Sequence, residues 1–427
     1  MKKRMIGIII IAALFIIGLF FIFTFKPFGL IEEVDVSKSP EISDTDIIEK
    51  IEEEIIGEEI NEDEEVQEEN GEEVEAELKE ELTFEEKIWK QRIDAAMAPS
   101  PCPDIPNPEY PDSYYKGPLI DTHLHLPAIP DSVPEEGEEE NYNYEDNEDG
   151  AFGGPAAILG VNVKISEIAC SLQREGTTKN FAFFPIYPEI TEQSLEITKK
   201  TMEQYPDFFT PFIMPPTEDT PTVEADVLEK MLAVYPGLFQ GYGEVGSSPT
   251  EPKNPPPDDP LYLDNYKLAR RHHLMVYYHP GKGQADNWNR VLQQHPDITF
   301  IVHADEIEED IDSLMTKYPN IYFTANPQFH QHFLLYVGGK SKEDFLKAAE
   351  RDFNDLIEKD LRRWETLIKR HPDRFMWGTD RGDAVWNYDT EVGLFLVKYG
   401  RAFIGKFDPE VQEMVAYKNA ERLFKRV

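Results

Sequence analysis

A His-x-His pair, His123 and His125, ends an apolar segment that is typical of a buried β-strand. Residues two apart in a strand point to the same side, so the two imidazoles share one face. Paired neutral imidazoles suit zinc or a similar divalent ion, which can lower the pKa of a bound water towards 7. The pair by itself also fits two half-exposed strand histidines, so the rest of the chain must decide.

Four further apolar segments each end in a residue that can bind a metal or transfer a proton. These residues are Glu244, His279, His303 and Asp380. The carboxyl ends of the strands of a parallel barrel meet at one rim, and that rim carries the active site of such barrels. Five such strand ends at one rim predict a divalent-metal site far more strongly than the His-x-His pair does.

The elements that must position these residues begin at Leu119, where short apolar runs start to alternate with amphipathic stretches. This alternation is typical of βα units around a parallel sheet. The predicted strands are 119–125, 181–187, 208–214, 239–245, 274–279, 298–303, 321–325 and 375–379. Eight strands close a barrel, so the fold class is predicted to be α/β, a (β/α)₈ TIM barrel.

A recurring turn supports this strand count. Five predicted helices end in Tyr-Pro or His-Pro, followed by Asp, Asn or Gly and then by a predicted strand. The prolines are Pro206, Pro236, Pro296, Pro319 and Pro372. Proline cannot continue a helix, and the residue types after it suit a turn. The repetition indicates a single architecture, closed by a last helix over residues 419–424 that should pack on the barrel.

Residues 1–30 are predicted to be a membrane anchor. Residues 6–25 contain no charge and no proline, which matches the roughly 20 residues needed to cross a bilayer. The segment has no Ala-x-Ala cleavage pattern, although a signal peptide and a buried core helix are the alternatives. Basic residues before it and acidic ones after it favour a cytoplasmic N-terminus. The prediction is therefore a single-pass membrane protein whose catalytic domain is extracytoplasmic.

Residues 31–86 contain 26 acidic residues against three lysines, and few aromatic ones. Such a segment cannot bury enough apolar surface to offset its ordering entropy, so a disordered acidic linker is predicted. Thr83 and Glu86 fit a capping box, which predicts a helix through Ile88, Trp89 and Ile93. An extended lead-in over 98–118 and the hydrolase domain 87–427, with its core at 118–425, complete the organisation.

The composition also limits the function. The formal net charge is −41, and the barrel part shares the acidic excess. Nucleic-acid binding needs basic surface, so nucleic acid is not expected as a partner. An acidic loop at 131–149 fits a solvated insertion. Two cysteines, Cys102 and Cys170, are too few for a disulfide framework and form no Cys-x-x-Cys motif, so they neither support nor oppose an extracytoplasmic location.

This pattern resembles the amidohydrolase superfamily, specifically its amidohydrolase-related branch. The matching segments are 120–125, 278–281, 301–304, 318–322, 377–380 and 419–424, and the resemblance covers about residues 118–425. It implies a metal-dependent hydrolase that cleaves an amide, ester or related bond in a small molecule. It also implies a zinc-type metal and, less often, non-oxidative decarboxylation.

Roles follow from the resemblance position by position. His123, His125 and His279 would be metal ligands. Asp380 would bind the metal or its water and take the proton of that water, which agrees with the ability of a neighbouring carboxylate to relay protons. His303 would polarise the substrate or stabilise developing charge.

Glu244 departs from the common pattern, in which binuclear members carry a carboxylated lysine on strand 4. TatD-like deoxyribonucleases, a more distant branch, have a similar Gly-Glu-x-Gly setting there. Glu244 would bridge a second metal, bind a water or support the other ligands. One zinc ion is therefore expected and a second is left open, while TatD-like nuclease activity is disfavoured by the acidic charge.

Six further residues near these strand ends are candidates for substrate contacts, although surface loops often carry such residues. They are Lys282, Gln328, His330, His332, Arg381 and Trp386. A non-catalytic binding domain and a decarboxylase on the same fold are the competing hypotheses. Substrate and oligomeric state do not follow from the sequence.

Overall fold

The computed structural model describes residues 82–427 except 138–155, 218, 247–254, 304, 327–340, 383–384 and 425–427. The predicted anchor at 1–30, nearly all of the acidic linker and most of the acidic loop lie outside the described residues. Among the described helices, none has the length and apolar character that crossing a membrane requires.

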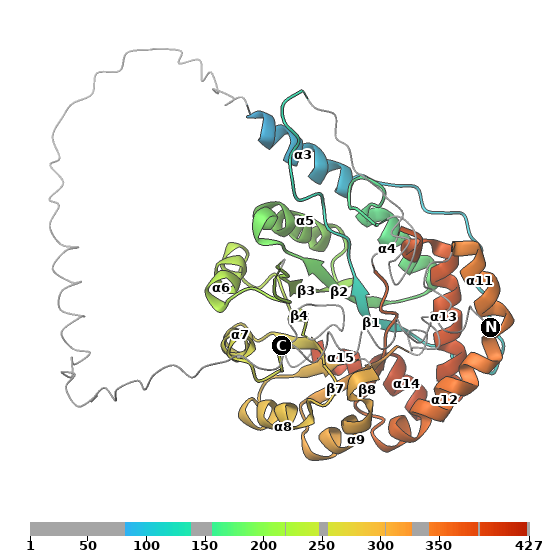
Figure 1. Cartoon of the computed structure of the whole chain (residues 1–427). Helices are drawn as coiled ribbons and strands as arrows, with labels where there is room; N and C mark the ends of the chain where they lie inside the picture. Colours follow the sequence, from blue (N-terminus) through green and yellow to red (C-terminus); the bar gives the residue numbers. More distant parts are fainter. Residues whose placement is uncertain are drawn as a thin grey trace, which may run out of the picture. The chain divides into compact units, whose positions relative to one another are not determined.

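Eight parallel strands form one sheet in chain order (Figure 1). They are β1 (Ile120–His125), β2 (Lys179–Pro185), β3 (Phe209–Met214), β4 (Gly241–Gly246), β5 (Met275–His279), β6 (Phe300–Val302), β7 (Ile321–Ala325) and β8 (Phe375–Trp377). The sheet returns to its first strand, because Leu124 forms a parallel bridge with Arg381 beyond β8. The predicted (β/α)₈ barrel is confirmed, with strand ends within two residues of the prediction.

Helices surround the strands (Figure 1). They are α4 (Ile165–Glu175), α5 (Thr191–Gln204), α6 (Ala225–Val234), α7 (Pro260–Arg271), α8 (Ala285–Gln294), α9 (Glu308–Lys317), α11 (Lys342–Arg351), α12 (Phe353–Arg370), α13 (Thr390–Ile404), α14 (Pro409–Glu413) and α15 (Asn419–Phe424). Helices α5, α6, α8, α9 and α12 each end directly before one of the five predicted Tyr-Pro or His-Pro turns. The turn chemistry therefore marks these helix ends correctly.

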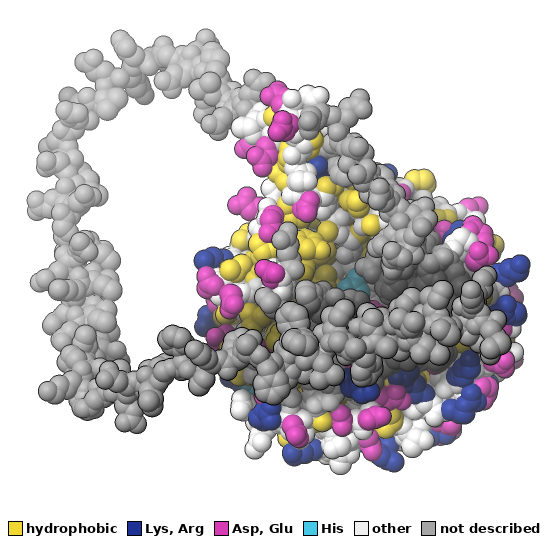
Figure 2. Space-filling model, viewed as in Figure 1, with side chains coloured by type: hydrophobic (Ala, Val, Ile, Leu, Met, Phe, Trp, Pro, Cys, Tyr) yellow, Lys and Arg dark blue, Asp and Glu magenta, His cyan; other side chains and the backbone are white. Residues whose placement is uncertain are grey.

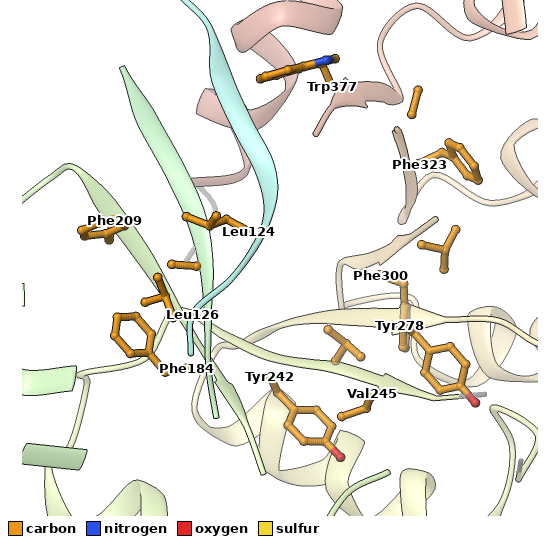
Figure 3. Packing of buried hydrophobic residues seen from close by; sticks show 14 of the residues in the cluster. Leu124, Leu126, Phe184, Phe209, Tyr242, Val245, Tyr278, Phe300, Phe323 and Trp377 are labelled. Carbon is orange, nitrogen blue, oxygen red and sulfur yellow. The ribbon is translucent and has the colours of Figure 1, made fainter. Parts of the chain in front are cut away.

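Two layers of apolar side chains hold the barrel. The interior layer is Ile120, Phe181, Phe183, Phe212, Met275, Tyr277, Ile301, Tyr322, Met376, Ala420 and Leu423. Its last two members belong to α15, so the final helix closes the floor of the barrel as predicted. Asn419 holds that helix in place by donating hydrogen bonds to the carbonyls of Pro372 and Phe375. Figure 3 shows members of the outer layer between sheet and helices, among them Leu124 and Tyr242.

The helix α3 (Phe84–Met97) precedes the barrel and begins at the predicted capping box. Glu86 N–H donates to Thr83 Oγ1, and Thr83 N–H donates to the Glu86 carboxylate at 2.7 Å. The helix packs on α4 and α5. Residues 98–118 then follow without helix or strand, and they include a turn at 112–113.

A disulfide joins Cys102 in the lead-in to Cys170 in α4, with a Cα–Cα distance of 5.6 Å. Sequence analysis does not predict this bond, because two cysteines 68 positions apart carry no information about proximity. The bond fastens the segment before β1 to the helix after it.

Replacing both cysteines with serine is expected to destabilise the protein. A cross-link over a separation of 68 residues restricts the unfolded chain, and its removal should cost about 4 kcal/mol. Denaturant unfolding of the Cys102→Ser, Cys170→Ser double variant and of the unmodified chain measures the difference. An unchanged midpoint, with no free thiol in the unmodified chain, would contradict the prediction.

Candidate metal centre

An irregularity in β1 directs the side chains of His123 and His125 toward the mouth of the barrel. The pairing of β1 with β2 shifts between Asp121 and Leu124. Ile120 lies in the interior layer and Leu124 in the outer one, although residues four apart in a regular strand share a face. The bulge re-aims the following side chains, as bulges at barrel rims commonly do. His123 and His125 consequently pack against Phe183 of the interior layer.

A second irregularity places Glu244. The pairing of β4 with β5 shifts between Tyr242 and Val245, and both of these side chains lie in the outer layer although they are three residues apart. Gly243 between them has φ of +123°, and a Cβ there would lie 2.1 Å from the Tyr277 carbonyl oxygen. Only glycine fits this conformation and this close approach. The Glu244 carboxylate consequently reaches the imidazoles of the barrel mouth.

The first group of side chains consists of His123, His125, Glu244 and Asp380. His123 Nε2 lies 3.0 Å from both Glu244 Oε2 and Asp380 Oδ1. His125 Nε2 lies 3.0 Å from the same Glu244 oxygen and 3.6 Å from Asp380 Oδ1. Two strand-1 imidazoles and two carboxylates thus converge on one small space.

The second group consists of Glu244, His279 and His303. His279 Nδ1 lies 3.1 Å from Glu244 Oε1, and His303 Nε2 contacts the same oxygen. The imidazoles of His279 and His303 meet edge to face, with centroids 4.5 Å apart. Glu244 therefore presents one carboxylate oxygen to each group. All six residues predicted from the sequence come together here, and they do so as two sets that share one carboxylate.

Charge in this space is concentrated and partly shielded from water. Burial opposes ionisation of Glu244, but the neighbouring His303 and His123 hold its pKa well below the usual range. The same balance, with His123 as the leading counter-charge, lowers the pKa of Asp380. Against its own burial, hydrogen bonds to Asp380 and Glu244 raise the pKa of His125 to about 10. The negative charge of two ionised carboxylates favours a divalent cation, which would displace the proton that an imidazole such as His125 holds.

The donor set fits a divalent ion. Nitrogen and oxygen donors in this proportion suit zinc, and manganese or iron accept similar sets. His279 Nε2 is a buried ring nitrogen without a hydrogen-bond partner among the described residues, at 3.9 Å from Glu306 Oε2. The side chains of His125, His279 and Asp380 are 26%, 21% and 23% exposed, so a small molecule can reach the group. A small area of histidine surface is visible near the middle of the face of the molecule that Figure 2 draws.

Asp121 links β1 to the segment that follows β8, behind the site. Its carboxylate accepts hydrogen bonds from the backbone N–H of His123 and of Thr379, and from Thr379 Oγ1. Burial raises the pKa of this carboxyl to about 6. Asp380 N–H donates to the His123 carbonyl at 2.8 Å, and the φ of Asp380 is +54°. These hydrogen bonds therefore fix the positions of His123 and Asp380 relative to each other.

The hypothesis that Arg381 contacts substrate is wrong. Its side chain is 1% exposed and forms an ion pair of 2.6 Å with the equally buried Glu175 of α4. Its Nε donates to the Asn387 carbonyl, so the side chain braces the segment after β8. Lys282 is exposed. The loop residues at 328, 330 and 332, and the side chain of Trp386, lie outside the described part.

Sequence analysis missed Asn326, which follows β7 directly. Its side-chain amide lies 2.9 Å from His123 Nδ1, and the residue is 7% exposed. The signal was available, because Asn326 is the first polar residue past the end of a predicted strand.

A parallel barrel with histidines and carboxylates gathered at the carboxyl ends of its strands defines a metal-dependent TIM-barrel enzyme. The model of the family described as "Amidohydrolase" matches residues 120–426. The chain belongs to this family, as the motifs predict, and is a metal-dependent enzyme of the amidohydrolase type. No curated protein matches the sequence.

Several solved structures are similar to this chain. An uncharacterised TIM-barrel protein from Bordetella bronchiseptica is 15% identical, with 72% of this chain and 98% of the other covered and a TM-score of 0.42. A 2,6-dihydroxybenzoate decarboxylase from Rhizobium is 15% identical, with 73% and 99% covered and a TM-score of 0.40. A dihydroorotase from Campylobacter jejuni is 10% identical, with 72% and 83% covered and a TM-score of 0.37. Neither substrate nor mechanism follows from similarity at this level.

Proposed function

We propose that the protein hydrolyses an amide, ester or related bond in a small molecule at a centre for two divalent ions, zinc being the favoured metal. The observation that carries the proposal is the division of six side chains into two groups that share Glu244. His123, His125 and Asp380 would hold one ion, and His279 and His303 the other. This extends the expectation from sequence, which favoured one ion and left a second open.

Bound divalent ions supply Lewis acidity, which activates water and polarises the bond to be cleaved. The chain itself supplies the proton transfer. Asp380 is a partly exposed carboxylate of the site, and in its ionised form it can accept the proton of the attacking water. The same carboxyl group can then deliver that proton to the leaving atom.

The position of His303 supports a ligand role. Its side chain is 5% exposed and contacts Glu244, while its Nδ1 lies 3.9 Å from Asp380 Oδ2. A side chain so enclosed is better placed to bind an ion than to reach the substrate. This replaces the substrate-polarising role that the family resemblance implies.

The packing of the barrel supports a substrate that enters from the loop side. Phe183 and Tyr277 fill the interior directly behind His123, with ring centroids 5.2 and 5.0 Å from its imidazole. The space for a substrate is therefore on the other side of the metal ligands, at the carboxyl ends of the strands.

We further propose that the catalytic domain works outside the cytoplasmic membrane, anchored by residues 6–25. Their composition supports a span, and the Cys102–Cys170 disulfide supports an oxidising compartment, where such bonds persist. Carbonate extraction of membranes tests the anchor. Release of the full chain into the wash would overturn it.

The hydrolytic proposal is tested with the purified full chain. Metal content is measured after incubation with zinc, manganese or iron, and the loaded protein is offered amides, lactones, cyclic imides, aromatic carboxylic acids and single-stranded DNA. We expect two equivalents of metal and turnover of an amide, lactone or imide. Loss of carbon dioxide from the aromatic acids would instead establish a decarboxylase, and DNA cleavage a nuclease. Trace metal under all conditions would overturn the proposal.

A further inference from the structure

The side chain of Asn326 is a buried amide in which one of the two polar atoms has a hydrogen-bond partner and the other has none among the described residues. Its Nδ2 lies 2.9 Å from His123 Nδ1, whereas its Oδ1 is buried without a hydrogen-bond partner among the described residues. A buried acceptor that is left without a hydrogen bond destabilises the folded protein. A residue that only filled this space would not need a polar atom there.

The orientation of this amide and the tautomer of His123 are linked. With Nδ2 donating, His123 Nδ1 must accept, so the ring proton resides on Nε2. Nε2 then donates towards Glu244 Oε2, at 3.0 Å, and its lone pair is unavailable to a cation. Rotating the amide by half a turn presents Oδ1 instead. Nδ1 then carries the proton and donates, and Nε2 is left with a free lone pair directed at the carboxylates.

We propose that Asn326 is a positioning residue that matches the tautomer of His123 to the state of the metal site. Its amide accommodates either tautomer: Nδ2 accompanies the ring that is protonated on Nε2, and Oδ1 accompanies the ring whose Nε2 binds an ion. A second ring nitrogen held by a fixed acceptor orients a metal-binding histidine and raises its basicity. An amide adds the ability to change partner role without moving the backbone. This inference rests on the proposed metal site.

The other side chains around the His123 imidazole do not form a hydrogen bond with its Nδ1 among the described residues. The His123 imidazole is completely buried and is enclosed by Phe183, Tyr277, His303 and His125. Two of these are engaged with Glu244, and the other two present ring surface. Among the described residues, Asn326 is the hydrogen-bond partner of the Nδ1 edge.

The test compares the metal affinity of three variants by competition with a chromophoric chelator. Asn326→Ala is expected to bind zinc about 10- to 100-fold more weakly than the unmodified protein. Asn326→Asp, whose carboxylate can accept from Nδ1–H, should retain the affinity. Asn320→Ala is the matched control, because that buried amide at the start of β7 donates to the carbonyls of His295 and Ile298, far from the ligands. It should lower thermal stability without changing the affinity.

Imidazole ¹⁵N chemical shifts of metal-free protein give a second readout that general destabilisation would not produce. His123 should be protonated on Nε2 in the unmodified protein and on Nδ1 in Asn326→Asp. Equal zinc affinity for Asn326→Ala and the unmodified protein, or an unchanged tautomer in Asn326→Asp, would overturn this inference and leave the proposed function intact. Failure of the unmodified protein to bind metal would overturn the proposed function itself.

Discussion

Replacing Glu244 with alanine is expected to remove both equivalents of bound metal and to reduce turnover to background. The reason is that Oε2 faces His123 and His125 while Oε1 faces His279 and His303. Loss of this one side chain therefore takes a ligand from each group at once. It also removes one of the two carboxylates whose negative charge attracts a cation to this space.

Elemental analysis after reconstitution with zinc measures the effect, and two comparisons make it specific. His279→Ala should lose one equivalent and keep the other, because it belongs to one group only. Glu306→Gln is the matched control: its carboxylate is 26% exposed at the same rim, 3.9 Å from His279 Nε2, but belongs to neither group. It should keep both equivalents. A Glu244→Ala protein that retained one tightly held ion would show that the carboxylate is not shared.

The barrel and its ligand types could be predicted because both depend on local signals. Tyr-Pro-Asp and His-Pro-Asp turns mark helix ends through the missing N–H and fixed φ of proline. Apolar runs that end in His279 or His303 mark the carboxyl end of a strand. Since every parallel strand brings that end to the same rim, a list of polar residues at strand ends becomes a site without knowledge of any loop.

What could not be predicted depends on register and distance. The bulges that contain His123 and Glu244 arise from pairing with β2 and β5, and a period of two does not reveal them. Nothing in the Gly-Glu-x-Gly motif shows which carboxylate oxygen faces which imidazole, so the position of Glu244 between the two groups could be found only from the fold. Arg381 follows Asp380 directly yet turns to Glu175 in α4, a partner more than 200 residues away.

Asp380→Asn should separate proton transfer from metal binding. An amide has nearly the shape of the carboxylate, and the backbone hydrogen bond from Asp380 N to the His123 carbonyl holds the residue in place. The amide cannot accept the proton of the attacking water. At saturating zinc we therefore expect kcat to fall about 10²- to 10⁴-fold, the usual contribution of a general base. Zinc affinity in the group of His123 and His125 should also fall, because an amide oxygen is a weaker donor than a carboxylate.

The control for this prediction is Asp121→Asn, which changes a buried carboxylate in β1, close to Asp380 in the fold. Asp121 bonds to Thr379 and to the His123 backbone but belongs to neither metal-binding group. Its substitution should lower the unfolding temperature, and it should lower kcat less than Asp380→Asn does. The two variants therefore distinguish a carboxylate that reacts from one that aligns the strands. An Asp380→Asn enzyme with kcat within tenfold of the unmodified protein, at full metal occupancy, would remove Asp380 from the chemical step. The proton would then have to pass through another partly exposed group of the site, and Glu306 beside His279 is the carboxylate placed to receive it.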